Sequence, residues 1–418
     1  MRSSKADPLR LYLGFSFFSS ALYTMIFTVN LLYYIVTAKL DPLQLVLVGT
    51  ALETSVFLFE VPTGVVADSY SRRTSVIVGI FLVGISFIVN GLFPVFWIIA
   101  LSQVIWGLGY TFTSGAQQAW ISDELGEEEA SLAFLRGSKM DQWGGLAGIL
   151  MSIAFSLLSL RAPIFIGGAL FIVMGFYLML RMPETGFSPL PAKDRNSWKH
   201  LSNTFGNGIR MLKLRPALIA ILGTGFLYGL YSEGYDRLWQ AHLLKRFSLP
   251  VLPGVHQWTS AADFNLVVWM AILKSATMIG SILALSRIEK QIDHPRMKTL
   301  VTTLMLCSAL LVAGLFGFAL AGRLGVMLIL VVGIGILREM ISPIYTAWVN
   351  HRLDSSVRAT VISMSSQMDA IGQIAGGPVV GAIAKRVSMT VGLITSAAML
   401  TPVLLLLGSQ RNREDAVN

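Results

Sequence analysis

Apolar residues gather into long runs along the whole chain, and short polar segments separate these runs. A helix that crosses a bilayer needs about 20 predominantly apolar residues. Twelve segments have this length and character, so the pattern predicts twelve transmembrane helices. Their predicted ranges are 11–37, 43–67, 75–93, 95–121, 134–158, 162–181, 217–243, 263–287, 299–320, 325–349, 360–384 and 388–408.

The longest polar segment lies between the sixth and seventh predicted helices and divides the chain into two halves. The predicted domains are an N-terminal six-helix half at 1–182, a cytoplasmic central loop at 183–215, a C-terminal six-helix half at 216–410 and a cytoplasmic tail at 411–418. The predicted fold class is therefore an all-α integral membrane protein with six plus six helices.

The two halves also repeat each other in sequence. A shift of 228 residues places the fourth and fifth predicted helices on the tenth and eleventh, which predicts two pseudo-symmetric halves. The matching pairs include Trp120 with Trp348, Asp141 with Asp369, Gly144 with Gly372, and Gly148 with Gly376.

Composition supports a membrane protein and excludes several other classes. Hydrophobic residues make up 54% of the 418 positions and charged residues 13%, whereas a soluble domain carries about 25% charged residues. The net charge of +9 comes from Lys and Arg in short loops, not from a compact basic domain, so nucleic-acid binding is excluded. These cations fall mainly on the side that holds both termini, which predicts cytoplasmic termini.

Other chemistry is sparse in the sequence. Cys307 is the single cysteine and lies in an apolar run, so no disulfide framework or cysteine metal site is expected. The loops contain no P-loop, metal cluster or nucleophile constellation. We therefore expect a protein that is not an enzyme and that binds no cofactor and no metal.

The loop between the second and third predicted helices carries the most specific motif. The segment Gly64 to Arg73, GVVADSYSRR, resembles the loop signature G-x-x-x-D-R-x-G-R-R/K of the major facilitator superfamily. Ser69 and Ser71 depart from that signature. The matching positions, which the resemblance assigns to a gate, are Gly64, Ala67, Asp68, Arg72 and Arg73.

Each part of this motif suggests a physical role. Gly64 would allow close approach of a neighbouring helix, and Asp68 would lie at the positive N-terminal end of another helix. The alternative is that Arg72 and Arg73 only anchor the loop at the membrane surface.

The resemblance covers nearly the whole chain and implies the major facilitator fold, with a substrate site between the halves and transport by alternating access. The segments Ser114–Asp123 and Tyr235–Trp239 resemble those of bacterial drug-efflux and tetracycline-resistance-like members. This implies proton-coupled efflux of small amphipathic molecules by a monomer in the bacterial plasma (inner) membrane, with protons and membrane lipids as further partners. Uptake or lipid handling by the same fold, and a non-transporting receptor or scaffold, remain alternatives.

One position departs from the pattern of family antiporters. Those members often carry an Arg on the fourth helix in R-x-x-x-G-x-G, and Gln103 stands at that place in this chain. The acids that could bind a proton are then those at membrane depth.

Ionisable residues inside a membrane are costly, so each is a candidate functional residue. When positions are counted from the helix starts, several of these ionisable residues lie near the membrane midplane. Others share one face in the outer half of the seventh predicted helix. Glu339 and Asp369 are the predicted coupling pair. The full set of candidate coupling and cavity charges is Glu53, Glu233, Asp236, Arg237, Lys274, Arg338, Glu339 and Asp369.

Two further expectations concern packing. Arg338 is expected to pair with an internal carboxylate, with an anionic group of the substrate as the alternative. The repeated acids and glycines are expected to form the contact between the halves, because small residues permit close crossing. That predicted half-interface comprises Asp141, Gly144, Gly148, Gly372 and Gly376.

Overall fold

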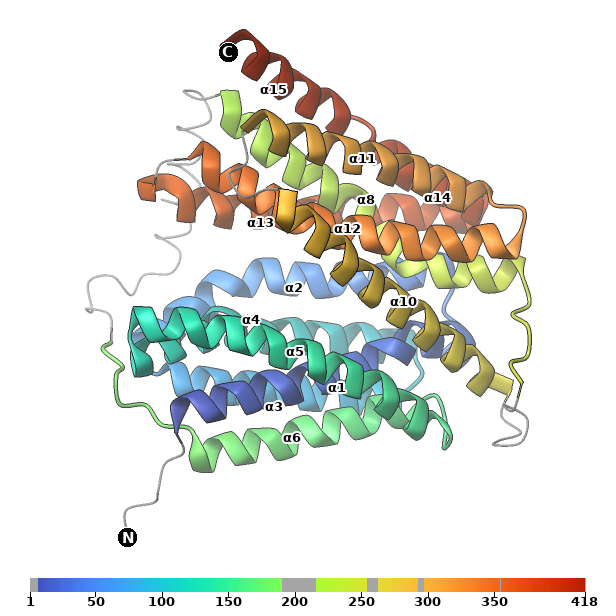
Figure 1. Cartoon of the computed structure of the whole chain (residues 1–418). Coiled ribbons are helices and arrows are strands. Elements are labelled where there is room, and N and C mark those ends of the chain that lie inside the picture. Colours follow the sequence, from blue (N-terminus) through green and yellow to red (C-terminus); the bar gives the residue numbers. More distant parts are fainter. Residues whose placement is uncertain (1–6, 190–215, 254–261, 292–296, 354, 418) are drawn as a thin grey trace. The chain divides into compact units, whose positions relative to one another are not determined.

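The computed structural model describes residues 7–189, 216–253, 262–291, 297–353 and 355–417, and these residues are helical apart from short connections (Figure 1). The first six helices are α1 (Pro8–Val36), α2 (Pro42–Ser69), α3 (Arg72–Leu92), α4 (Phe96–Leu125), α5 (Glu127–Ser156) and α6 (Ala162–Arg181). The others are α8 (Pro216–Arg246), α10 (Ala262–Gln291), α11 (Met297–Leu320), α12 (Leu324–Arg352), α13 (Ser355–Arg386), α14 (Met389–Leu400) and α15 (Val403–Val417). Most of the predicted central loop, 190–215, lies outside the described residues.

Several helices extend beyond their apolar runs into polar sequence. α5 begins at Glu127 rather than at 134, because acidic residues in a first turn interact favourably with the helix dipole. α1 begins at Pro8, where the Asp7 side chain accepts a hydrogen bond from the backbone N–H of Leu9 at 3.1 Å. Hydropathy alone could not reveal these ends.

The last predicted helix, 388–408, is divided in the structure. α14 ends at Leu400 and α15 begins at Val403, with Thr401 and Pro402 between them. Proline has no backbone N–H and cannot complete the helical hydrogen bonds. The predicted span is present as the apolar segment Met389–Asn412, which contains this break, and α15 also continues through most of the predicted tail.

Nine segments of the described chain are long and apolar enough to cross a membrane, and the last of them, Met389–Asn412, runs through both α14 and α15. The other long helices are α5, α8 and α13, which carry more polar and charged residues along their length. Polar residues inside a spanning helix mark candidate functional segments, and two of these three helices, α8 and α13, line the cavity described below.

The chain forms two compact units. Unit 1 contains Met1–Leu40, Ala51–Leu201 and Pro250–Ala271, and unit 2 contains Asp41–Thr50, Ser202–Leu249 and Ile272–Asn418. The first turns of α2 and of α10 therefore cluster apart from the rest of those helices. The predicted domain boundaries at the central loop stay a prediction.

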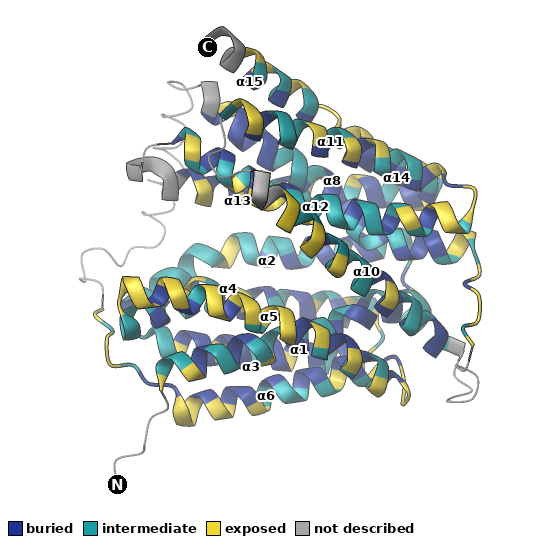
Figure 2. Cartoon of the chain, viewed as in Figure 1, coloured by how far each residue is buried: buried dark blue, intermediate teal, exposed yellow. Residues whose placement is uncertain are grey.

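The two units have equivalent internal packing, as the sequence repeat requires. In unit 1, α1 packs on α5, and α3 packs on α4 and α6. In unit 2, α8 packs on α13, and α11 packs on α12, α14 and α15. In Figure 2, α6 illustrates the result: its buried positions recur every three or four residues, and exposed residues occupy the other face.

The repeated glycines serve this internal packing. A Cβ on Gly144 would overlap the carbonyl oxygen of Phe17 on α1, and one on Gly148 would overlap that of Ala21. In unit 2, a Cβ on Gly372 or Gly376 would likewise overlap a carbonyl oxygen of α8. The structure therefore shows these glycines in the helix contacts within each unit, and their assignment to an interface between the halves stays a prediction.

The side chain of Asp141 takes no part in the contact between α1 and α5 at Gly144 and Gly148. The residue is exposed on α5, and its backbone carbonyl accepts a hydrogen bond from the Ser20 hydroxyl of α1 at 2.6 Å.

Candidate functional site

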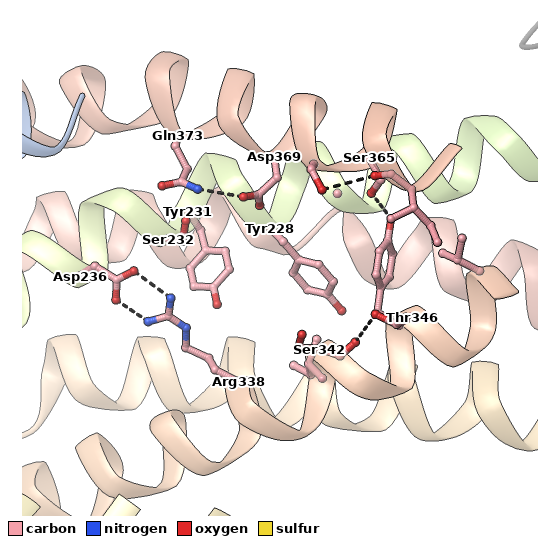
Figure 3. Close-up of a pocket in the computed structure, with 16 residues that line it drawn as sticks. Tyr228, Tyr231, Ser232, Asp236, Arg338, Ser342, Thr346, Ser365, Asp369 and Gln373 are labelled. Carbon is pink, nitrogen blue, oxygen red and sulfur yellow. Dashed lines mark hydrogen bonds and ion pairs between the residues drawn. The ribbon is translucent and has the colours of Figure 1, made fainter. Parts of the chain in front are cut away.

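Unit 2 contains a cavity of about 500 Å³ between α8, α12 and α13 (Figure 3). Each helix contributes one stripe of residues at helical spacing. The lining residues are Gly225, Tyr228, Tyr231, Ser232 and Asp236 of α8; Arg338, Ile341, Ser342, Tyr345, Thr346 and Val349 of α12; and Ile362, Ser365, Ser366, Asp369 and Gln373 of α13.

An ion pair joins two of these helices across the cavity. Both terminal nitrogens of Arg338 bind the carboxylate of Asp236, with the Nη2–Oδ2 contact at 2.7 Å (Figure 3). The guanidinium carbon also lies 6.0 Å from the Tyr231 ring centre and 5.9 Å from that of Tyr235. Arg338 thus has the internal carboxylate partner expected from the sequence, and the pair carries no net charge.

Asp369 lies on the α13 side of the same cavity and has a different kind of partner. Its carboxylate accepts a hydrogen bond from the neutral amide of Gln373, one turn further along α13, at 2.8 Å (Figure 3). The cavity therefore contains one carboxylate bound by a cation and one bound by an amide.

Aromatic rings and hydroxyl groups line the remaining wall. The Tyr345 hydroxyl donates to the carbonyl of Ile221 at 2.8 Å and lies 2.5 Å from the Ser365 hydroxyl. The Tyr228 hydroxyl lies 2.7 Å from that of Ser308, and the Tyr228 and Tyr345 rings meet edge to face. Such a wall offers both apolar ring surface and hydrogen-bonding groups to a bound molecule.

The other charges of α8 form a separate, internal pair. Glu233 is 3% exposed and accepts a hydrogen bond from Arg237 Nε at 2.8 Å. A Cβ on Gly49, in the segment of α2 that belongs to unit 2, would overlap the Glu233 carboxylate. Tight packing and a cation on the same helix indicate a structural role for Glu233 rather than substrate contact.

The remaining predicted charges are not among the residues that line this cavity. Glu339 is exposed on α12, because its neighbour Arg338 occupies the cavity stripe and successive helical residues point about 100° apart. The structure therefore does not bring together the predicted pair Glu339 and Asp369. Glu53 lies on the part of α2 in unit 1, and Lys274 is half-buried on α10. Within the described chain the Lys274 ammonium group has no hydrogen bond or ion pair.

The predicted gate motif forms a charged cluster at the α2–α3 turn in unit 1. Arg72, the first residue of α3, binds Asp123 of α4 at 2.5 Å and the carbonyl of Ala119 at 2.8 Å. Its contact with Asp68 is longer, at 3.5 Å. Ala67 is buried beside this cluster, whereas no atom lies near a Cβ placed on Gly64. Within unit 1, the described residues therefore show no close helix approach at Gly64.

The second arginine of the motif, at the start of α3, forms hydrogen bonds with residues at and just after the end of α6. Arg73 donates from its side chain to the carbonyl of Met179 at 2.6 Å, and its backbone N–H donates to Glu184 at 2.9 Å. Glu184 also accepts from the Ser71 hydroxyl. Both arginines thus act inside the protein, rather than only anchoring the loop to lipid.

Unit 1 contains a neutral polar cluster that the sequence reading missed. The Tyr34 hydroxyl oxygen lies 3.0–3.1 Å from the side-chain amide nitrogens of Asn30, Asn90 and Gln103, within hydrogen-bonding distance of all three. All four side chains are almost fully buried. Gln103, which stands where family antiporters often have an arginine, therefore belongs to a neutral network. The sequence does not show which buried amides meet, so this network could not be predicted from it.

The cavity hydroxyls were also missed, although their spacing carried a signal. Ser342 and Thr346 follow Arg338 at intervals of four residues, and Ser365 precedes Asp369 by four. Serine and threonine are common in membrane helices, because their hydroxyl groups can donate to a backbone carbonyl of the preceding turn. A single serine or threonine in a helix therefore does not by itself indicate a binding site.

Comparisons with known proteins agree with this architecture. An uncharacterized MFS-type transporter, YxaM, of Bacillus subtilis (strain 168) is 21% identical over 400 residues, which cover 91% of this chain and 90% of that protein. The crystal structure of the nucleoside transporter NupG matches with a TM-score of 0.74 and 14% identity, covering 97% of this chain and 99% of that one.

A bacterial homolog of the human lysosomal transporter Spinster, in an inward-facing and unoccupied conformation, matches with a TM-score of 0.73 and 15% identity, covering 97% and 96% of the two chains. At such identities these structures show the shared fold. The family model of the Major Facilitator Superfamily matches residues 13–377. The chain therefore belongs to the major facilitator superfamily and is a multi-pass membrane transporter.

Proposed function

We propose that this transporter is a proton-coupled secondary carrier that exports small amphipathic molecules by alternating access. The cargo binds against the wall of α8, α12 and α13, where the Tyr228, Tyr231 and Tyr345 rings meet its apolar part and the cavity hydroxyls meet its polar part. Asp369 carries the proton.

The observation that carries this proposal is the contrast between the two cavity carboxylates. Asp236 is held by the Arg338 guanidinium, whereas Asp369 is hydrogen-bonded by the neutral Gln373 amide. A charge at membrane depth is costly without an opposite charge, and binding a proton removes that charge from a carboxylate. Asp369 is thus suited to bind and release a proton during the cycle.

We propose a bacterial inner membrane with both termini in the cytoplasm as the setting. Lys and Arg are more frequent in the segments on the side of the termini, which is the orientation signal for bacterial membrane proteins. In this orientation the α2–α3 turn and the Arg72 cluster face the cytoplasm.

The test is transport in proteoliposomes under an imposed pH gradient, with ethidium and tetracycline as amphipathic cargo. The wild type should transport at least one of them in response to the gradient. Asp369→Asn should abolish gradient-driven transport while cargo binding persists. Asp141→Asn is the matched control, because Asp141 is the repeat equivalent of Asp369 and is exposed on α5. Equal gradient dependence in wild type and Asp369→Asn, or a requirement for ATP, would refute the proposal.

A second candidate is uptake of a hydrophilic, hydroxyl-rich solute. The many hydroxyl and amide groups of the cavity favour it, namely those of Ser232, Ser342, Thr346, Ser365, Ser366 and Gln373. Uridine in the same proteoliposomes distinguishes the candidates, since gradient-driven movement of uridine without movement of the dyes would select this second function.

A further inference from the structure

A second hollow lies on unit 1, far along the chain from the cavity residues. It is a groove of about 420 Å³ between α1, α5 and α6. Apart from Arg10 its lining is apolar or aromatic, and it includes Leu11, Phe18, Met151 and Val173. Phe18 is 59% exposed and Val173 62% exposed, so the groove opens at the surface of the unit.

The length of the groove matches one leaflet of a bilayer. Along α1 it runs from Arg10 to Leu22, and twelve helical steps of 1.5 Å correspond to about 18 Å. The hydrocarbon core of a bilayer is about 30 Å thick, so one leaflet contributes about 15 Å. An acyl chain that begins at the Arg10 end would therefore reach the other end of the groove near the midplane.

The two ends of the groove differ in charge. Arg10, whose side chain is 89% exposed, stands at one end, and its Nε lies 3.6 Å from the Asp7 carboxylate. Tyr177 of α6 lines the same end, and the exposed Arg181 follows one turn later. Arginine and tyrosine are side chains that lie at the level of lipid headgroups. The other end of the groove, toward Leu22 and Leu170, has no charged lining residue among those described.

A glycine opens the α1 side of the groove. Among the described residues, no atom lies within 4 Å of a Cβ placed on Gly14, which is a lining residue. A side chain at this position would fill the groove without disturbing the packing of α1, and this property makes the site testable.

We propose that this groove holds one anionic phospholipid of the cytoplasmic leaflet. An acyl chain lies along α1 and α6 over Gly14, and the lipid phosphate lies against the Arg10 guanidinium. The leaflet follows from the orientation proposed above, whereas the site itself does not depend on which solute the protein carries.

The test is native mass spectrometry of the full chain in a mild detergent. Phosphatidylglycerol and phosphatidylcholine with identical acyl chains are titrated separately, and the first bound lipid is quantified. We expect the wild type to bind one phosphatidylglycerol at least 10-fold more tightly than phosphatidylcholine. Gly14→Ile should weaken both lipids about 10-fold by filling the groove, and Arg10→Gln should remove the preference for phosphatidylglycerol.

Two control variants make the result specific. Gly408→Ile adds the same side chain to α15, at another glycine whose Cβ would meet no atom of the described residues, and should leave the first bound lipid unchanged. Arg323→Gln removes an exposed charge at the start of α12 and should leave the lipid preference unchanged. Arg10 is exposed, so Arg10→Gln should fold even if Gly14→Ile does not.

Several results would overturn the proposal. These are equal affinity of the wild type for the two lipids, an unchanged preference in Arg10→Gln, or an unchanged first affinity in a folded Gly14→Ile variant. Folding is checked by size-exclusion elution and by thermal unfolding. The transport assay is independent of this measurement, so failure of either proposal can be recognised separately.

Discussion

Gly229 of α8 lies directly against the backbone carbonyl of Asp369 on α13, so closely that a Cβ on Gly229 would overlap the carbonyl oxygen. The equivalent place in unit 1 pairs the Ser20 hydroxyl of α1 with the carbonyl of Asp141 on α5. The same helix crossing is thus used in both units. In unit 2 it fixes the backbone that carries the cavity carboxylate.

Replacement of this glycine should destabilise unit 2. Gly229→Ala forces α8 and α13 apart, and overpacking of this kind costs about 1–3 kcal/mol. The thermal unfolding midpoint of the purified protein should fall accordingly. Gly223→Ala on the same helix is the control, because its Cβ would meet only the end of the Leu406 side chain, at 3.0 Å. Equal midpoints for the two variants would contradict the prediction.

The Arg338–Asp236 pair should show strong energetic coupling. Arg338→Ala leaves a carboxylate inside the membrane without its cation, and we expect a loss of about 2 kcal/mol because both groups retain some access to the cavity. Asp236→Ala should cost a similar amount. In a double-mutant cycle the combined variant should lose less than the sum of the single losses. Strict additivity, or an Arg338→Ala protein of normal stability that loses only transport of anions, would show that the cargo supplies the counter-charge.

In the gate cluster the two carboxylates should contribute unequally. Asp123 binds Arg72 at 2.5 Å and its side chain is 25% exposed, whereas Asp68 lies at 3.5 Å and is 44% exposed. Asp123→Asn should therefore lower stability by about 1–2 kcal/mol and Asp68→Asn by less than about 0.5 kcal/mol. Thermal unfolding measures both losses, and a larger effect of Asp68→Asn would reverse the assignment.

The effect of Asp68→Asn on transport is a separate prediction. We expect the variant to insert normally and to transport more slowly, since the resemblance assigns Asp68 to gate geometry rather than to substrate contact. Initial rates in proteoliposomes at matched protein content provide the measurement. A wild-type rate would remove Asp68 from the gate.

The neutral cluster of unit 1 should be sensitive to loss of its central acceptor. Tyr34→Phe removes the oxygen that accepts hydrogen bonds from Asn30 and Gln103, and each buried donor without a partner costs about 1–3 kcal/mol. Tyr110→Phe is the control, because Tyr110 is 45% exposed. Thermal unfolding should separate the two variants clearly, and a Tyr34→Phe protein as stable as the control would show that the cluster is dispensable.

Hydropathy predicted the membrane helices and their order, because the bilayer imposes a length and an apolar composition on any spanning segment. It could not predict helix ends that depend on polar residues, such as the start of α5 at Glu127, or the break at Pro402. The repeated glycines predicted that helices pack closely at these positions, and the structure shows such close contacts. The sequence did not identify the partner helix, since any backbone can occupy the space beside a glycine.

The candidate site was predictable only in part for a similar reason. Helical spacing grouped Glu233, Asp236 and Arg237 on one side of α8, yet the structure divides them between a cavity pair and a buried pair. The choice between Arg338 and Glu339 depends on the rotation of α12, which a one-residue step in sequence does not reveal.

The Arg338–Asp236 ion pair has a consequence for the response of the protein to voltage. A membrane potential acts on net charge, at about 2.3 kcal/mol per elementary charge for every 100 mV. Equal and opposite charges that move together experience no net force from this field. The intact pair can therefore shift along the membrane normal as one unit without net electrical work, provided that its two charges neither separate nor turn in the field. Any dependence of the transport rate on membrane potential then comes from the proton on Asp369, from ionisable groups such as Lys274, and from the charge of the cargo itself.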